Sequence, residues 1–531
     1  MDTKALRQKI LDLAIRGKLV PQDPNDEPAE VLLERIREQK QQMFKEGKLK
    51  KKDIKNDTII FKGEDNLHYE KFQDGTVKCI EDEIPFEVPE GWCWARVRDI
   101  AMVKGGKRLP KGASFSEEIT THAYIRVTDM KNHSVNISNL RYISDEIFSA
   151  IKNYTIAKDD LYVTIAGTIG VVGEIPDKLD GMNLTENAVK ITNIAINKSF
   201  LCIILQTDFV QQQFQDKTHQ VAMPKLALER ILSTLIPICP YVQQLQIVDR
   251  FQICDNFLST IDTEKEELQK IVSLSKYKIL DLAIRGKLVP QDPNDEPASV
   301  ILERIRTEKE ELIKQGKIKR DKKESVIFKG DDNSYYLRTE LETMEIADEL
   351  PYEIPESWEW ARIGNVFQVN PRNKLDDLLE VSFIPMPLID DGFSGKHTSE
   401  VRVWKKIKSG FTHFTEGDIG IAKITPCFEN RKSVVFRNLK NNYGAGTTEL
   451  HVLRPYASSI LPEYVLAYVK SSMFIDKGKQ EFTGAVGQQR IGKDYVENSY
   501  FPIPPLAEQK RIVEQISTVY KQLDLISNAL C

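Results

Sequence analysis

A string of 21 residues occurs twice in this 531-residue chain. KILDLAIRGKLVPQDPNDEPA occupies residues 9–29 and recurs without a change at residues 278–298, an offset of 269. Chance does not produce an identity of this length, so part of the chain is duplicated. The repeat constrains the fold strongly, because it predicts two structural units built on one shared plan.

Shorter matches extend the repeat on both sides of a region where the two halves differ. After the identical string, VLLERIREQK matches VILERIRTEK, IIFKG matches VIFKG, and EIPFEVPEGWCWARV matches ELPYEIPESWEWARI. The halves match again in IPICPYVQQLQIV and FPIPPLAEQKRIV. Each half thus has repeated connectors on both sides of a private middle, a region whose sequence the other half does not share. This arrangement predicts two equivalent docking scaffolds that carry different recognition modules. Duplication followed by gene conversion of one connector is the alternative.

A heptad pattern predicts one long helix between the two halves. From Ile247 to Leu282 the chain steps by four and three residues, and nine of the eleven positions are apolar, weakly so at Cys254. This is the spacing of a coiled-coil seam. The helix is expected over residues 243–285, a length of about 65 Å, and Gly286 and Pro290 end it. A helix packed inside one larger domain is the alternative.

The two ends of the chain resemble the two parts of this helix. Ile10 and Leu13 repeat its second part, and its first part is repeated with an offset of 265 by Ile512, Ile516, Val519, Leu523 and Ile526. The simplest arrangement is two long antiparallel helices with pseudo-two-fold symmetry. The predicted fold class is α+β, with two mixed α/β domains separated by long antiparallel coiled-coil helices.

These patterns divide the chain into five regions. They are a helical connector at 1–84, a first recognition domain at 85–240, a central region with the long helix and repeated connector at 241–348, a second recognition domain at 349–505, and a C-terminal helix at 506–531. β-branched runs such as LYVTIAGTIGVVGEI and DIGIAKITPCF predict many short strands in the middles. One short helix follows in each, in SFLCIILQTDFVQQQF and PEYVLAYVKSSMFI.

The composition is that of a soluble globular protein, with 41% hydrophobic and 29% charged residues. No apolar run approaches the ~18 residues of a membrane span, and the first residues, MDTKALRQKI, are charged where a signal peptide is apolar. Seven scattered cysteines without a C-x-x-C pair argue against a zinc site and a disulfide framework. We therefore expect a cytoplasmic protein without a metal site or a membrane partner.

Catalytic and cofactor motifs are missing from the sequence. It contains no phosphate-binding G-x-x-x-x-G-K-[ST], no H-E-x-x-H, no G-x-S-x-G and no Asn-Pro-Pro-aromatic motif of amino-methyltransferases. GTIGVVG lacks the G-x-G-x-x-G spacing, so its glycines are predicted to lie in a turn between strands. We expect no catalytic, cofactor-binding or metal-binding residue in this chain.

Positive charge is local, because the whole chain has a net charge of −5. Basic residues interleave with glycines in the first middle, as in a loop that follows a phosphate backbone. Its candidates are Arg96, Arg98, Lys104, Lys107, Arg108 and Lys111, together with Arg126. The second middle adds Arg402, Lys405, Arg431 and Lys432, and the side-chain types that read adenine and guanine edges at Gln488, Gln489 and Arg490. A solvated charged face is the alternative for each patch.

The closing segments resemble the specificity (S) subunits of type I restriction–modification systems. FPIPPLAEQKRIVEQI, from Phe501, is of the IP-x-PP-L-x-E-Q-K-R-I-V type that closes the variable regions of that family. LIPICPYVQQLQIVDRF, from Leu235, departs from it, with Cys239 for a proline and Gln243 for the glutamate. LDLAIRGKLVPQDPNDEPA is similar to the repeated connector of one branch of the family, and the resemblance covers nearly the whole chain.

The resemblance implies two target recognition domains, each of which reads one half of a bipartite double-stranded DNA site. It also implies that catalysis belongs to partners: modification subunits that methylate adenine from S-adenosylmethionine, and restriction subunits that need ATP and magnesium. The duplicated connector predicts two docks, hence two modification subunits. The alternatives are the recognition subunit of a bipartite-site type II enzyme, a coiled-coil scaffold without DNA specificity, and a methyltransferase or nuclease with unrecognised motifs.

Overall fold

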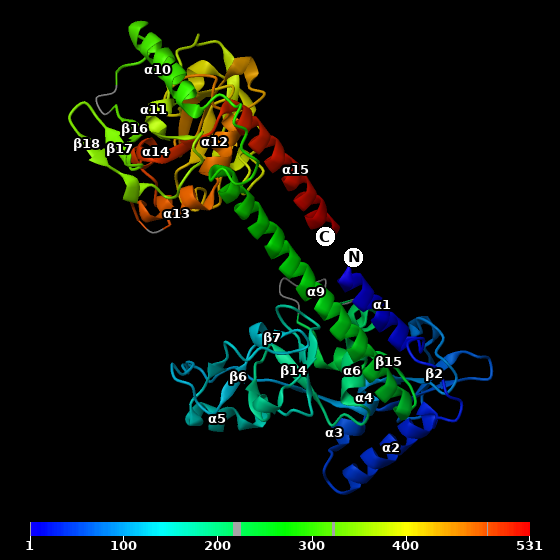
Figure 1. The fold of residues 1–531 in the computed structure, drawn as a ribbon. Coiled ribbons are helices and arrows are strands. Elements are labelled where there is room, and N and C mark those ends of the chain that lie inside the picture. Colours follow the sequence, from blue (N-terminus) through cyan, green and yellow to red (C-terminus); the bar gives the residue numbers. More distant parts are fainter. Residues whose placement is uncertain (1, 216–224, 321–323, 486, 531) are drawn as a thin grey trace. The chain divides into compact units, whose positions relative to one another are not determined.

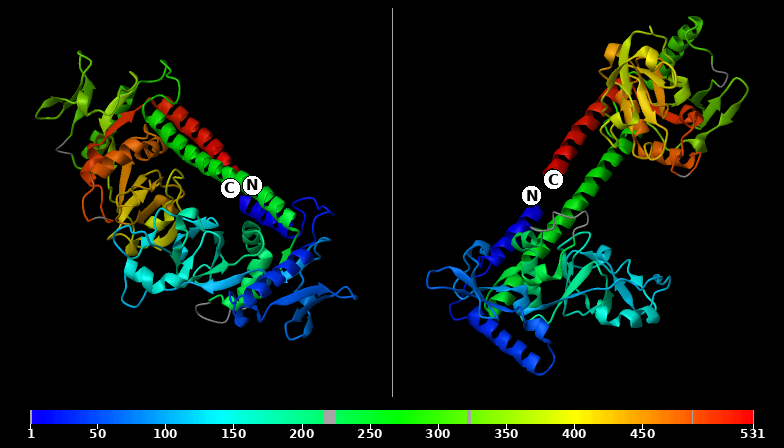
Figure 2. Two further views of the ribbon diagram at one scale, coloured as in Figure 1. Left: turned by 90° about the horizontal axis from the view of Figure 1, so that it is seen from below. Right: turned by 180° about the vertical axis from the view of Figure 1, so that it is seen from behind.

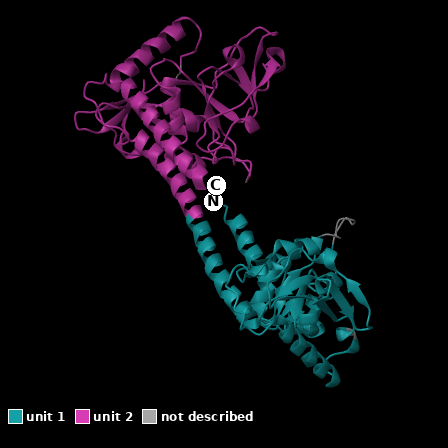
Figure 3. Cartoon of the chain, turned by 90° about the vertical axis from the view of Figure 1, so that its right-hand side faces the viewer, with its two compact units in different colours: residues 1–264 teal, residues 265–531 magenta. Residues whose placement is uncertain are grey.

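Two compact units, residues 1–264 and residues 265–531, make up the chain (Figure 3). The computed structural model describes residues 2–215, 225–320, 324–485 and 487–530. The boundary between the units falls inside α9 (Tyr241–Ile284), a single helix of 44 residues. The long helix predicted for residues 243–285 is therefore confirmed, and each unit contains one part of it.

The first unit is a mixed α/β structure (Figure 1). Besides the first part of α9, its helices are α1 (Thr3–Ile15), α2 (Ala29–Lys45), α3 (Lys51–Ile54), α4 (Val97–Ile100), α5 (Asp145–Ile151), α6 (Lys198–Leu205), α7 (Asp208–Gln215) and α8 (Leu228–Leu232). Its strands are β1 (Thr58–Lys62), β2 (His68–Phe72), β3 (Val77–Cys79), β4 (Cys93–Arg96), β5 (Met102–Gly105), β6 (Ala123–Ile125), β7 (Met130–Lys131), β8 (Ser134–Val135), β9 (Arg141–Tyr142), β10 (Thr155–Ile156), β11 (Leu161–Thr164), β12 (Val172–Glu174), β13 (Met182–Leu184), β14 (Ala188–Thr192) and β15 (Leu235–Ile238).

The second unit is built from the same kinds of element. Besides the second part of α9, its helices are α10 (Ala298–Lys314), α11 (Ile363–Val366), α12 (Pro462–Val469), α13 (Ser472–Gln480), α14 (Lys493–Asn498) and α15 (Leu506–Leu530). Its strands are β16 (Val326–Lys329), β17 (Tyr335–Arg338), β18 (Thr343–Glu345), β19 (Glu359–Arg362), β20 (Phe367–Val369), β21 (Glu380–Ile384), β22 (Glu400–Val403), β23 (Thr412–Thr415), β24 (Ile419–Ala422), β25 (Ser433–Val435), β26 (Tyr443–Gly446), β27 (Leu450–Pro455) and β28 (Tyr500–Ile503).

The two units share one sheet topology although their middles differ in sequence. The sheets of the first unit run β1-β2-β3, β10-β13-β6-β9, β12-β11-β14-β5 and β15-β4, beside a small β7-β8 hairpin. Those of the second run β16-β17-β18, β23-β26-β21-β22, β25-β24-β27-β20 and β28-β19, in the same order strand for strand. Even the parallel pair is common to both, β13 with β6 and β26 with β21. The predicted private middles are therefore two versions of one domain.

Apolar packing explains how different sequences reach this one topology. All four residues of β11, LYVT, and of β24, IGIA, are buried. One core in the first unit joins α1, α2, β4, β11, β14, α6 and α9, and one in the second unit joins α9, α10, β19, β24, β27, α12 and α15. A fully buried strand needs apolar side chains of suitable volume more than particular ones. The described helices include none that is long and apolar enough to cross a bilayer.

Two expectations from the sequence are corrected. Residues 1–84 are not only helical, because β1, β2 and β3 form an antiparallel sheet there, with turns at Asn66 and Gly75, both at positive φ. The short helix expected after each set of strands is two helices, α6 with α7 and α12 with α13. The break has a local cause in the second unit, where the Ser471 side chain accepts a hydrogen bond from the Phe474 N–H and so begins a new helix.

Each end of the chain packs antiparallel on α9 within its own unit (Figures 1 and 2). In the first unit, Thr3 of α1 donates to Asp262 at 2.6 Å, and Arg7 pairs with Asp255 at 2.5 Å. In the second, the Tyr520 hydroxyl of α15 donates to the Lys276 carbonyl at 3.0 Å. Thus α1 accompanies the first part of α9, and α15 accompanies the second part. Residue 531, the end of the predicted C-terminal helix, lies outside the described residues.

A buried indole joins the repeated connector to the closing helix in both units. The Trp92 Nε1–H donates to Gln243 Oε1 at 2.9 Å and to Gln22 Oε1 at 3.0 Å. In the second unit, the Trp358 Nε1–H donates to Glu508 Oε2 at 2.9 Å. Gln243 and Glu508 hold equivalent positions, so the departure of the first closing segment from the family pattern preserves the acceptor.

In each unit, a glycine of the identical string packs closely against a proline beside the indole. Gly17 has φ +63°, and a Cβ there would lie 2.4 Å from the Pro89 Cγ. Gly286 has φ +66°, and its Cβ would lie 2.4 Å from the Pro355 Cγ. Only glycine adopts this backbone conformation readily and leaves room for the proline. The repeat therefore encodes one packing arrangement twice.

Replacing Glu508 tests the indole contact. We expect Glu508→Gln to change the free energy of unfolding little, because Gln243 already fills that role in the first unit. Glu508→Ala leaves the Trp358 N–H buried without this acceptor and should cost about 1–3 kcal/mol. Urea denaturation measures both. Equal stability of the two variants would contradict the role of the acceptor.

The carboxyl of Glu508 should also make the stability of the second unit depend on pH. Burial raises the pKa of Glu508 above its ordinary value. A carboxyl whose pKa is higher in the folded than in the unfolded chain stabilises the folded state fully at a pH below its unfolded pKa. This stabilisation is lost as the pH rises through its folded pKa. The Glu508→Gln variant should lack this loss, and Gln243→Glu is the matched reverse change in the first unit.

Candidate nucleic-acid interface

Four predicted cations of the first unit lie along β5 and the loop that follows it. Lys104, Lys107, Arg108 and Lys111 are all exposed. Lys104 and Lys111 form no ion pair with any residue that the structure describes, and Arg108 Nε lies 3.8 Å from Glu186 Oε1 with 77% of its side chain exposed. The Lys107 ammonium lies 5.4 Å from the ring centroid of Tyr154. These side chains are available to phosphate groups.

The backbone beneath these cations is held in place. The Lys107 N–H donates to the Leu184 carbonyl at 2.9 Å, and the Tyr124 hydroxyl donates to the Lys107 carbonyl at 2.7 Å. A Cβ at Gly106 would lie 2.0 Å from the Thr185 carbonyl oxygen, so only glycine fits there. The loop thus presents exposed cations from an anchored start.

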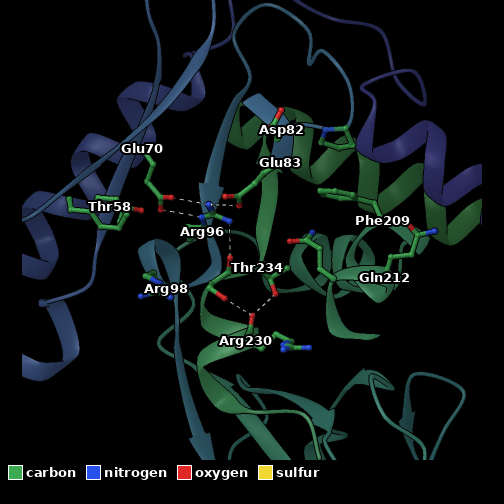
Figure 4. Close-up of a pocket in the computed structure, with 14 residues that line it drawn as sticks. Thr58, Glu70, Asp82, Glu83, Arg96, Arg98, Phe209, Gln212, Arg230 and Thr234 are labelled. Atoms are coloured by element: carbon green, nitrogen blue, oxygen red, sulfur yellow. Dashed lines mark hydrogen bonds and ion pairs between the residues drawn. The ribbon is translucent and has the colours of Figure 1, made fainter. Parts of the chain in front are cut away.

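Arg96 and Arg98 do not belong to that exposed group. Arg96 is buried, and its guanidinium pairs with Glu70 at 2.9 Å and with Glu83 at 2.8 Å (Figure 4). Arg98 pairs with Glu229 at 2.7 Å. Both line a cavity of about 730 Å³ in the first unit. Arg96 joins β4 to the β1-β2-β3 sheet, so its charge is used inside the protein.

Five further candidates are engaged with groups of their own unit. Arg126 is held by Asp129 at 2.7 Å, and Arg402 pairs with Glu400 at 2.7 Å while its guanidinium lies 3.6 Å over the Phe383 ring. The others are Arg431, which donates to the Lys470 carbonyl at 2.9 Å; Lys432, which donates to the Ile389 carbonyl at 2.9 Å; and Arg490, which pairs with Glu449 at 2.8 Å. Lys405 stays exposed.

The Gln488–Gln489–Arg490 stretch lies at an edge of the second unit. The Gln489 backbone is paired with Thr425, whose N–H donates to the Gln489 carbonyl at 2.9 Å. The hydrogen bond from Arg490 lowers the pKa of Glu449. Gln488 is exposed. Residue 486 of the predicted GAVGQQRIG segment lies outside the described residues.

Backbone hydrogen bonds show that the candidate patches of the two units lie at equivalent edges. In the first unit, Leu226 N–H donates to Ile165 O and Ile165 N–H to Asn187 O. In the second, the same ladder runs from Ile491 N–H to Lys423 O and from Lys423 N–H to Glu449 O. Arg490 therefore corresponds to Lys225, which donates to the Glu186 carbonyl beside Arg108. Sequence reasoning missed Lys225 and Lys423.

Lys225 could have been found by aligning the two halves through their closing segments, because the offset of 265 places it opposite Arg490. A short helix precedes each closing segment in both units, α8 in the first and α14 in the second, and the chain enters each helix from this edge. The described residues hold no group of three or more His, Cys, Asp or Glu side chains arranged to bind a metal ion.

Comparison with known proteins identifies the family. The family model for the type I restriction modification DNA specificity domain matches residues 89–271 and 355–530, more than half of the chain. The chain belongs to this specificity family. Its two matches fall one in each half, in agreement with the repeat. The two equivalent edges thus lie one in each specificity domain.

Curated members of the specificity family are clearly similar to the chain. The type I restriction enzyme EcoAI specificity subunit of Escherichia coli is 44% identical over 285 residues, which cover 52% of this chain and 45% of that protein. The EcoEI specificity subunit of the same species is 47% identical over 240 residues, 45% of this chain and 37% of that protein. The aligned part is less than half of each relative. The crystal structure of the HsdS subunit from Thermoanaerobacter tengcongensis has a TM-score of 0.46 at 16% identity, covering 85% of this chain and 94% of that one.

Neutralising the exposed loop of the first specificity domain should weaken DNA binding at every sequence. With Lys104, Lys107, Arg108 and Lys111 changed to glutamine, the slope of log affinity against log salt should flatten by about 0.9 for each phosphate that the loop no longer neutralises. Fluorescence anisotropy at several salt concentrations measures the slope.

Changing Gln488, Gln489 and Arg490 to alanine provides the contrasting variant. Base contacts carry sequence choice, so this variant should relax the preference in one half-site and leave the salt slope nearly unchanged. The same phenotype from both sets would refute the division into backbone and base contacts.

Proposed function

We propose that the chain is the DNA-recognition subunit of a type I restriction–modification system. It reads a bipartite double-stranded target, one half-site with each specificity domain, and directs methyltransferase and restriction subunits to that target. The observation that carries this proposal is that the two units share one sheet topology but have different residues at equivalent edges. A protein that recognises two different half-sites with one architecture needs this combination.

The exposed cations support a DNA-facing edge in the first domain. Lys104, Lys107, Arg108 and Lys111 extend from an anchored loop, and phosphate contacts of this kind position a protein on the duplex. In the second domain, Lys405 and Gln488 are the exposed candidates. Arg126, Arg431 and Lys432 are less suited to bind DNA, because each would first have to leave a partner inside its unit. The side chains of Arg402 and Arg490 are 39% and 40% exposed, so their ion pairs can be exchanged for contacts with DNA at small cost.

The chain is proposed to be non-catalytic. The sequence contains no motif for S-adenosylmethionine or ATP chemistry, and the relatives are named specificity subunits. Adenine methylation with S-adenosylmethionine and restriction with ATP and magnesium then belong to partner subunits, with which the chain acts in the cytoplasm. The identical connectors offer two equivalent docks for the modification subunit.

The helix pairs are proposed to set the distance between the two half-sites. α1 packs on the first part of α9 and α15 on the second part, as a long antiparallel coiled coil with pseudo-two-fold symmetry requires. A helical connector of fixed length favours one gap between half-sites. A scaffold without DNA specificity would not need the exposed basic loop. The recognition subunit of a bipartite-site type II enzyme is not favoured, because the matching family model and the curated relatives are of type I.

Methylome sequencing tests the proposed function directly. We expect adenine methylation at one bipartite motif that disappears when the gene is deleted. Replacing residues 85–240 by the corresponding region of a relative with another target should change one half of the motif and leave the other half. A chimera that altered both halves, or a deletion that altered no motif, would refute the proposal.

The stoichiometry of the complex is a second test. Because the connector is identical over 21 residues, we expect two modification subunits per chain. Native mass spectrometry of the complex, with the modification subunit in excess, measures the ratio. Saturation at a single copy would show that the two connectors are not equivalent docks.

A further inference from the structure

Three aromatic rings and one guanidinium meet where the second specificity domain contacts the helices of its unit. Phe393 and Arg431 belong to region 349–505, while Tyr277 lies on α9 and Tyr520 on α15; these four residues are the aromatic cluster. The Phe393 ring centroid lies 4.8 Å from that of Tyr277 and 5.6 Å from that of Tyr520, both edge to face. The Arg431 guanidinium carbon lies 4.3 Å over the Tyr277 ring. Both geometries are attractive.

The domain side of the aromatic cluster is held by a buried lysine. Lys470, at the end of α12, is 3% exposed, and its ammonium donates to the carbonyls of Gly392 at 2.6 Å and Arg431 at 2.8 Å. Arg431 Nε donates back to the Lys470 carbonyl at 2.9 Å. The Gly392 N–H donates to the Asn430 carbonyl at 2.7 Å. The loop that carries Phe393 and the turn that carries Arg431 are therefore joined to each other and to α12.

The helix side of the aromatic cluster is equally well connected. The Tyr520 hydroxyl donates to the Lys276 carbonyl, and the Lys276 ammonium pairs with Asp524 at 2.5 Å. The same ammonium lies 5.8 Å from the Phe393 ring centroid and 5.5 Å from that of Tyr520. Phe393 thus contacts both helices at a point where they are bonded to each other.

The first unit keeps the helix contact, but the positions that match Tyr277 and Tyr520 carry no ring. By the repeat offsets of 269 and 265, Gln8 corresponds to Tyr277 and Asp255 to Tyr520. Neither side chain has a ring. Asp255 pairs instead with Arg7, the counterpart of Lys276. Gln206, at the end of α6, takes the place of Lys470 and donates to the Cys202 carbonyl of its own helix.

We infer that the aromatic cluster positions the second specificity domain on α9 and α15, and thereby determines which gap between half-sites the chain accepts. This inference rests on the proposed function and deepens it. Arg431, chosen from the sequence as a DNA contact, is then a positioning residue. The first domain has no rings at the matched positions and uses other contacts, among them Phe209 of α7 against Phe86 and Trp94.

A rigid attachment raises selectivity for the gap because both half-sites must be engaged by one chain. When the second domain is held in one direction, a target with a different gap is reached only by distorting protein or DNA. When the attachment is loosened, the effective concentration of the second domain at its half-site in the native target falls. Binding to targets with another gap then becomes less unfavourable. One base pair added to the gap also turns the second half-site by roughly 34° about the duplex axis.

The test uses the chain in complex with its modification subunit and three DNA targets, with the native gap and with one base pair more or fewer. Tyr277→Gln places the residue of the first unit in the second, and Phe393→Ala removes the central ring. We expect each to lower the ratio of native-gap to altered-gap affinity about tenfold, with an unchanged salt slope. Gln8→Ala, at the matched position of the first unit, should leave the ratio unchanged.

The outcomes separate the inference from the proposed function. If the unaltered complex shows no preference for one gap, the proposed bipartite recognition fails. If it shows a preference that Tyr277→Gln and Phe393→Ala both retain, or if affinity falls equally for all three gaps, the positioning role is overturned. Tyr277→Phe keeps the ring and should restore the ratio, and circular dichroism checks that each variant is folded.

Discussion

The arrangement of each unit depends on a buried indole N–H that donates a hydrogen bond to the first turn of the closing helix. A buried donor without a partner is costly. The Trp92 N–H is satisfied by Gln243 together with Gln22, and the Trp358 N–H by Glu508. The same acceptors contact the identical string: Gln243 Nε2 donates to Asp26 at 3.1 Å, and Glu508 accepts from Gln291 at 2.6 Å. In each unit, three segments far apart in sequence meet at this contact.

This contact also explains why the connectors are alike while the middles are not. Residues of the identical string touch one another and the closing helix, so a change at one of them leaves another without its partner. The β-strands of the middles have a looser requirement, since the four buried positions are filled by LYVT in β11 and by IGIA in β24. Variation can therefore collect at the edges of the specificity domains while their topology is kept.

Much of the architecture followed from sequence, and rather less of the site did. The repeat, the long helix and the glycine-rich turn at Gly167 and Gly170, both at positive φ, were predicted from periodicity and turn chemistry. The candidate cations were chosen by residue type, and composition does not show whether a cation has an internal partner. Arg96 and Arg431 are close to other basic residues in sequence, yet in the fold one is paired with Glu70 and the other lies over Tyr277.

The sequence by itself determined that there are two units on one plan, because a 21-residue identity folds the same way twice, and that a long helix lies between them, because heptad spacing is a local property. The tertiary structure alone decided that the two middles are one domain in two versions, since topology is carried by pairing between distant strands. It also decided which charges are free. An ion pair such as Arg490 with Glu449 joins residues 41 positions apart, and only the folded chain brings such partners within hydrogen-bond distance.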